Sequence, residues 1–81
     1  MKILLVDDHA VVRQGYASLL KALLPEVQVD EAGSGEEALS AVPLLAPHLV
    51  VLDIGLPGIS GLETCRRLRQ RLPQLPVLFF S

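Results

Sequence analysis

The chain has 81 residues, a length that fits one domain, and a formal net charge of -2. This charge gives no electrostatic reason to bind nucleic acid. Hydrophobic residues make up 51% of the chain and aromatic residues only 4%, which predicts an aliphatic core of the kind that forms between a parallel sheet and its helices. The single cysteine, Cys65, excludes an internal disulfide bond and fits a reducing cytosol.

The sequence also argues against export and membrane insertion. No basic N-terminus precedes an apolar segment, so we do not expect a signal peptide. No apolar run approaches the roughly 20 residues that are needed to cross a bilayer. We therefore expect a cytoplasmic protein with no membrane contact.

Apolar strands and amphipathic helices alternate along the first half of the chain. An unbroken apolar run predicts a central strand over residues 2–7. Residues 9–24 form a helical pattern that Pro25 ends, and residues 27–31 alternate as in a strand near an edge. One apolar face of this helix is expected to consist of Val12, Tyr16, Leu19, Leu20 and Leu23.

The second half of the chain repeats this alternation. Ser34 and Glu37 have the spacing of a capping box at the start of a second helix, which continues through Leu45. Pro43 lies inside that helix and removes a backbone donor, so we expect a kink or an early end there. A third apolar strand covers residues 49–53.

The remaining segments predict one more helix and one more strand. A loop rich in glycine and proline, residues 55–61, leads to a helix over residues 62–72, and residues 76–80 form the fourth strand. The side chains that this helix is expected to bury are Leu62, Cys65, Leu68 and Leu72.

This order of elements predicts an α/β fold with a doubly wound parallel sheet. Right-handed crossovers between parallel strands leave few possible topologies. The strand order 2-1-3-4 fits best, because the first and third strands are the most uniformly apolar. Ligands bind such sheets beyond the C-terminal ends of the strands at which the order reverses, here the first and third strands.

Three aspartates stand at that point. Asp7 and Asp8 follow the first strand, and Asp53 ends the third. Carboxylates that are held close together are costly unless a cation neutralises them, and Mg²⁺ prefers such hard oxygen ligands. We expect Asp8 and Asp53 to be direct ligands and Asp7 to act through water. The carbonyl group of Gly55 could add another oxygen, and an oxygen of Asp53 could attack phosphorus to form an acyl phosphate.

A simpler interpretation exists for each aspartate taken alone. Aspartate after a strand is a common turn or capping residue, and Asp8 could simply cap the first helix. The convergence of all three on one point favours a functional site. His9 follows the acidic pair and could touch the site, but we favour a surface residue at this position.

Two segments resemble a known family, the receiver domain of two-component response regulators, most closely its NarL/FixJ type. Residues 3–9 read ILLVDDH, and residues 52–61 read LDIGLPGISG. Members of this type commonly have the same acidic pair and the same Asp-Ile-x-Leu-Pro motif at these places. The resemblance extends over the whole chain.

The resemblance implies a flavodoxin-like fold and a role for each residue of the motifs. Asp53 would accept a phosphoryl group from a sensor histidine kinase, and Asp7 and Asp8 would hold Mg²⁺. Gly55 would supply a carbonyl ligand. Ser81, at the end of the fourth strand, would be the switch hydroxyl that binds a phosphoryl oxygen.

The chain also departs from the family pattern. A complete receiver has about five strand–helix units, and the fourth helix, the fifth strand with its lysine, and the fifth helix are absent here. The helix-turn-helix output domain of this subfamily is absent too. We therefore expect residues 1–81 to be a partial receiver domain that contacts DNA only through an output domain outside this segment.

Two alternative functions remain open. The first is a fragment that cannot be phosphorylated and that self-associates, as a homodimer or a larger species, through the exposed strand over residues 77–80. The second is an aspartate-nucleophile phosphatase of the haloacid-dehalogenase type. That family has a second aspartate two residues after the nucleophile, where this chain has Gly55, so we expect a protein that is not an enzyme.

Overall fold

The computed structural model describes residues 1–80; Ser81, the expected switch hydroxyl, lies outside the described residues. None of the described helices is both long and apolar enough to span a membrane. The elements in chain order are β1 (Lys2–Val6), α1 (Ala10–Leu23), β2 (Gln28–Ala32), α2 (Gly35–Leu45), β3 (Leu49–Asp53), α3 (Gly61–Arg71) and β4 (Val77–Phe80).

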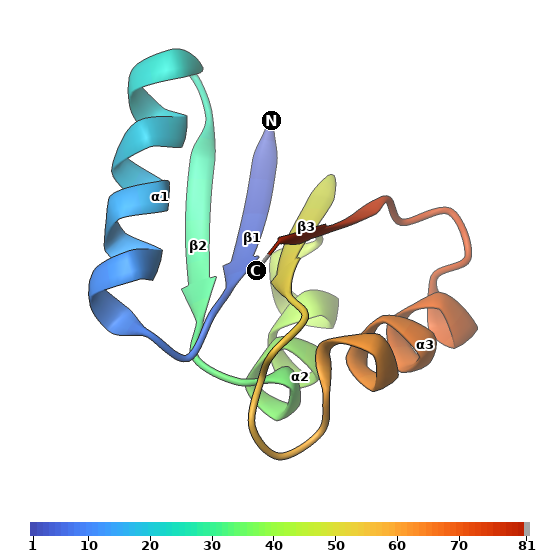
Figure 1. The fold of residues 1–81 in the computed structure, drawn as a ribbon. Helices are drawn as coiled ribbons and strands as arrows, with labels where there is room; N and C mark the ends of the chain where they lie inside the picture. The colour runs from blue at the N-terminus through green and yellow to red at the C-terminus, as the bar shows by residue number, and fades with distance from the viewer. Residues whose placement is uncertain (81) are drawn as a thin grey trace.

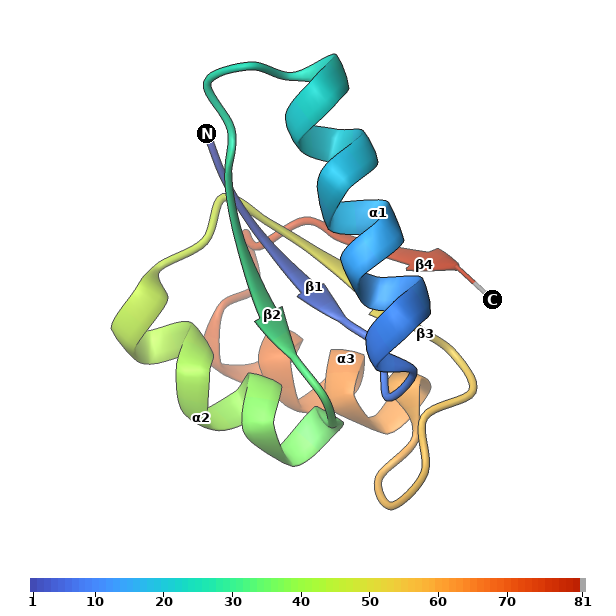
Figure 2. The same ribbon diagram turned by 90° about the vertical axis from the view of Figure 1, so that its left-hand side faces the viewer.

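The strands form one parallel sheet in the order β2-β1-β3-β4, which confirms the predicted flavodoxin-like, doubly wound topology. β1 and β3 are central, and their C-terminal ends lie side by side at the lower edge of the sheet (Figure 1). Helix α1 covers one face of the sheet, and α2 and α3 cover the other (Figure 2). The register pairs Val6 of β1 with Leu52 of β3.

The core lies mainly between the sheet and the pair α2 and α3. Residues of β1 are buried on both faces of the sheet, as a central parallel strand requires. The side chains of this core cluster are Leu4, Val6, Ala32, Ala38, Val42, Val50, Leu52, Leu56, Leu68 and Leu75. The absence of aromatic side chains from this cluster agrees with the aliphatic core expected from composition.

The apolar face of α1 is mostly exposed, contrary to what its helical spacing implies for a packed helix. Ala17 is the one residue of α1 that is buried. The exposed apolar side chains of this helix are Val11, Val12, Tyr16, Leu19 and Leu23. The small side chain of Ala17 lets α1 approach the sheet, Tyr16 meets Phe80 of β4, and the outer part of the apolar face stays exposed.

The prediction for α3 was only partly right. Leu68 is buried, and Cys65 is half-buried against the core, but Leu62 and Leu72 are exposed. The buried face instead runs through Gly61, Thr64 and Leu68. Small residues at the start of this face allow α3 to pack closely on its neighbours, and this close packing turns Leu62 toward solvent.

Helix α2 begins as predicted but does not end at Pro43. The hydroxyl of Ser34 accepts the N–H of Glu37 at 3.0 Å, the first bond of a capping box, whereas the Glu37 carboxylate accepts the N–H of Gly33 at 3.0 Å rather than that of Ser34. The helix continues through Pro43 to Leu45. Burial of Val42 holds this last turn in place, and its carbonyl accepts the N–H of Ala46 at 2.9 Å, so the missing donor of proline does not end the helix early.

Gly61 brings the start of α3 directly against the end of β3. A Cβ atom at this position would overlap the backbone oxygen of Asp53 and lie 2.8 Å from Cα of Ile54. Because backbone atoms cannot move aside as a flexible side chain can, only glycine permits this approach. Gly61 therefore helps to fix the backbone of Asp53, because its lack of a side chain lets α3 pack directly against that backbone.

We predict that Gly61→Ala destabilises the chain by about 1–3 kcal/mol, because the added methyl group forces α3 away from β3. Gly15→Ala is the control, since no atom lies within 4 Å of a Cβ at this position in α1. The control should be more stable than the parent by up to about 1 kcal/mol, because alanine favours a helix. Urea denaturation measures both changes, and equal stability of the parent and Gly61→Ala would contradict the close approach.

Candidate functional site

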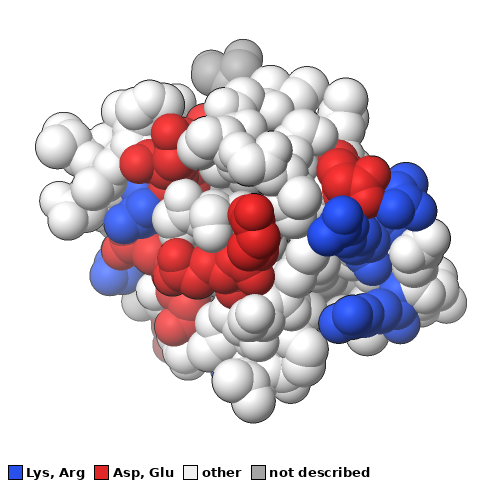
Figure 3. Space-filling model, turned by 90° about the horizontal axis from the view of Figure 1, so that it is seen from below, with Lys and Arg blue, Asp and Glu red and all other residues white. Residues whose placement is uncertain are grey.

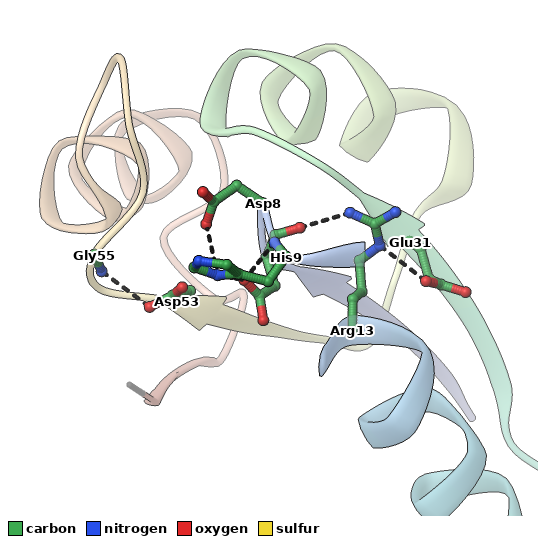
Figure 4. Close-up of polar contacts among 7 residues, drawn as sticks. Asp8, His9, Arg13, Glu31, Asp53 and Gly55 are labelled. Carbon is green, nitrogen blue, oxygen red and sulfur yellow. Dashed lines mark hydrogen bonds and ion pairs between the residues drawn. The ribbon is translucent and has the colours of Figure 1, made fainter. Parts of the chain in front are cut away.

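Three carboxylates converge at the C-terminal ends of β1 and β3. Since Val6 lies opposite Leu52, the residues that follow them, Asp7 and Asp53, lie next to each other. One ligand atom from each of Asp7, Asp8, His9 and Asp53 lies within 4.8 Å of the others. Asp7 and Asp53 are only 1% and 7% exposed, whereas Asp8 is open to solvent. The predicted convergence of the three aspartates is therefore present (Figure 4).

Asp7 is held in an ionised state by its neighbour. Its Oδ1 accepts the backbone N–H of His9 at 3.0 Å and lies 3.1 Å from Nδ1 of the same residue. Burial raises the pKa of Asp7, but the hydrogen bonds from the backbone N–H and the side chain of His9 outweigh it, so this pKa lies below its ordinary value. Asp7 is thus a carboxylate at neutral pH.

His9 touches the site, which is the less favoured of the two roles that the sequence left open for it. Its side chain is 65% exposed, yet Nδ1 lies 3.1 Å from Asp7 Oδ1 and 3.2 Å from Asp8 Oδ1. The hydrogen bond to Asp7 and the charge of Asp8 raise the pKa of His9 above its ordinary value. The alternative role of Asp8 as a helix cap is wrong, because His9 is the N-cap of α1 and no side-chain cap bond forms.

Gly55 orients the carboxylate of Asp53. Its N–H donates to Asp53 Oδ1 at 2.9 Å, which fixes the orientation of the carboxylate and leaves lone pairs on both oxygens. Gly55, Asp53 and Asp7 line a hollow of about 480 Å³. The far wall of this hollow is aromatic: Tyr16 of α1 and Phe80 of β4 meet edge to face with ring centroids 5.0 Å apart.

Acidic side chains dominate the middle of the face that carries the site. Figure 3 views the edge of the sheet at which β1 and β3 end, and basic side chains flank the acidic ones, with a larger group on the right and a smaller one on the left. Among the described residues, the ion pairs of Asp7 and Asp8 involve only His9. Carboxylates of this density, two of them buried, match the donor set of a hard divalent cation.

Sequence reasoning missed one further residue, Arg13. Its Nη1 donates to the backbone oxygen of Asp7 at 2.6 Å, and its Nε donates to Glu31 of β2 at 2.9 Å. The only indication in the sequence is a basic residue in the first turn of the helix that follows Asp7 and Asp8. That signal is weak, because arginine at such a position usually points to solvent.

Known proteins resemble the chain along its whole length. The model of the response regulator receiver domain matches residues 3–81. The transcriptional activator protein ExaE of Pseudomonas putida is 64% identical over 81 residues, which are 100% of this chain and 38% of that protein. The DNA-binding transcriptional activator DevR/DosR of Mycobacterium tuberculosis is 48% identical over 82 residues, which are 100% of this chain and 37% of that protein.

A solved structure agrees with these relatives. The crystal structure of a two-component response regulator of the LuxR family from an Aurantimonas species superposes with a TM-score of 0.92 at 39% identity, covering 98% of this chain and 56% of that one. The chain spans well under half the length of the two activators. From the match to the family model, which covers nearly every residue, we conclude that the chain belongs to the response regulator receiver domains.

Proposed function

We propose that the chain is a phosphoacceptor that takes a phosphoryl group from a sensor histidine kinase onto Asp53. In this proposal Asp8 and Asp53 bind Mg²⁺ directly, Asp7 binds it through water, and the carbonyl group of Gly55 adds a ligand. The observation that supports it best is the convergence of Asp7, Asp8 and Asp53 within 4.8 Å, where His9 is the only side chain paired with Asp7 and Asp8 in the described part of the chain. Such a cluster is costly without a cation and suits Mg²⁺.

Each residue has a defined part in the transfer. Asp53 Oδ1 stays on the N–H of Gly55, and Oδ2 attacks phosphorus, forming a P–O bond as the P–N bond to the histidine of the kinase breaks. The electron pair of the broken bond returns to the imidazole. When bound, Mg²⁺ would neutralise the carboxylates and the charge of the phosphoryl oxygens. Ser81 as the switch hydroxyl remains part of the proposal.

The longer relatives support a wider proposal. Two of them are named as transcriptional activators, and the chain spans 38% and 37% of their lengths. We infer a regulator of transcription whose DNA contact lies outside residues 1–81, with no enzymatic activity on other substrates. A cytoplasmic location, where a histidine kinase would meet it, belongs to the same proposal.

A specific observation favours self-association as a second property. β4 is an edge strand, and its Leu78 and Phe79 are exposed. The carbonyl groups of Pro76 and Phe80 accept hydrogen bonds from β3, so in a parallel ladder the backbone groups of Val77 and Phe79 face away from the sheet. Such an edge can pair with the same strand of a second copy across a two-fold axis.

Phosphorylation of Asp53 is the first testable consequence. Treatment with acetyl phosphate and Mg²⁺ should add the mass of one phosphoryl group, seen by intact mass spectrometry. Asp53→Asn should abolish the adduct, and removal of Mg²⁺ with a chelator should do the same. Asp30→Asn is the matched control: this residue lies on β2, outside the carboxylate cluster, and its loss should leave the adduct in place.

Three results would separate the possibilities. An adduct that persists in Asp53→Asn would show that another residue accepts the group. No adduct on the 81-residue chain, with an adduct on a version that extends through a further strand, would show that this segment needs additional residues. No adduct on either version would refute the phosphoacceptor function.

The edge of β4 generates a separate prediction. Leu78→Lys places a charge on the exposed side chain of this edge strand and should convert self-associated chain to monomer, as charged edge residues oppose strand pairing. Sedimentation velocity measures the change. Leu44→Lys serves as the control, because Leu44 is also an exposed leucine but lies on α2, away from the edge strand. A parent chain that is folded and monomeric at high micromolar concentration contradicts the proposed association.

A further inference from the structure

The segment that joins β1 to α1 carries Asp7 and Asp8, yet it lacks the usual helix cap. Ser34 and Ser60 cap the other two helices with hydroxyl groups that accept a backbone N–H at 3.0 Å. His9, the N-cap of α1, makes no such bond, because its ring turns to the carboxylates. Another contact must therefore fix the segment that presents the acidic pair.

Arg13 supplies that contact. Its Nη1 donates to the backbone oxygen of Asp7 at 2.6 Å, and its Nε donates to Glu31 Oε1 at 2.9 Å (Figure 4). The Arg13 side chain is only 19% exposed. The backbone passes close beside it, since a Cβ atom at Gly33 would lie 3.4 Å from Nη1. The guanidinium group is thus enclosed by β2 and the segment after it.

The two hydrogen bonds that the Arg13 guanidinium group donates fix the positions of their acceptors relative to each other. The guanidinium is planar and presents its N–H groups as a rigid fork, so Glu31 on β2 orients the donor that reaches Asp7. The N–H of Asp7 donates to the oxygen of Ala32 at 3.1 Å. The peptide groups on both sides of Asp7 are therefore tied to β2, one directly and one through Arg13.

We propose that Arg13 is a positioning residue for the Mg²⁺ site, one that holds the backbone of Asp7 and Asp8 where the cation needs their carboxylates. This inference rests on the proposed function of the site. Groups that orient metal ligands without touching the metal commonly change its affinity by about 10–100-fold. Electrostatics alone predicts the opposite sign, because removal of a nearby positive charge should strengthen the binding of a cation.

The opposite signs make the test sharp. Titration calorimetry with MgCl₂ should show about tenfold weaker binding to Arg13→Met than to the parent chain. Arg13→Lys keeps the charge but loses the fork, so it should show weaker binding as well. Arg67→Met is the matched control, because Arg67 also pairs with a glutamate, Glu63 at 2.8 Å, but on α3 and outside the carboxylate cluster. Its Mg²⁺ affinity should stay within about twofold of the parent.

Each outcome decides the matter. Binding to Arg13→Met that equals or exceeds that of the parent overturns the inference, and so does normal binding to Arg13→Lys, which would show that charge alone suffices. A thermal denaturation of each variant, recorded by circular dichroism, confirms that folded chains are compared; if Arg13→Met does not fold, Arg13→Lys decides. A parent chain that binds no Mg²⁺ overturns this inference together with the proposed metal site, whereas failure of the variants alone leaves that site intact.

Discussion

The register of β1 against β3 is the constraint on which the site depends. Because Val6 lies opposite Leu52, the residues that follow, Asp7 and Asp53, meet at one point on the edge of the sheet. Both are buried, so water screens their mutual repulsion poorly. Either residue alone would be an ordinary end to a strand. The pairing of the two strands turns them into a site that favours positive charge, and His9, when protonated, provides part of that charge within the chain.

The segments that leave these strands are fastened by different means. After β3, the missing side chain of Gly61 lets α3 lie directly on the backbone of Asp53. After β1, the fork of Arg13 ties the backbone of Asp7 to Glu31 on β2. The segment after β3 is held by close packing. The segment after β1 is held by charge-assisted hydrogen bonds, which are stronger than hydrogen bonds between neutral groups. Both devices act on the backbone, so the carboxylates themselves stay available to a ligand.

The hollow beside the site connects it to the exposed apolar surface. Tyr16 and Phe80 form its aromatic wall, and their edge-to-face contact joins α1 to β4 across the sheet. The same two elements carry much of the exposed apolar surface among the described residues, including Leu19 and Leu78. Any segment or second copy that covered this surface would also border the hollow.

The order of the elements, the central places of β1 and β3 and the meeting of the three aspartates could all be predicted from the sequence. These features follow from local patterns, since an unbroken apolar run indicates a central parallel strand and such strands end at a common edge. The burial of the helical faces and the contacts of His9 and Arg13 depend on how the elements pack and could not be read from local patterns. Leu62 and Leu72 have the spacing of core residues but are exposed, because burial depends on which elements lie opposite. Arg13 reaches the site because β2 pairs with β1 and Glu31 of β2 then lies within hydrogen-bond distance of Arg13. Arg13 and Glu31 are far apart in the sequence, so no local pattern predicts this contact.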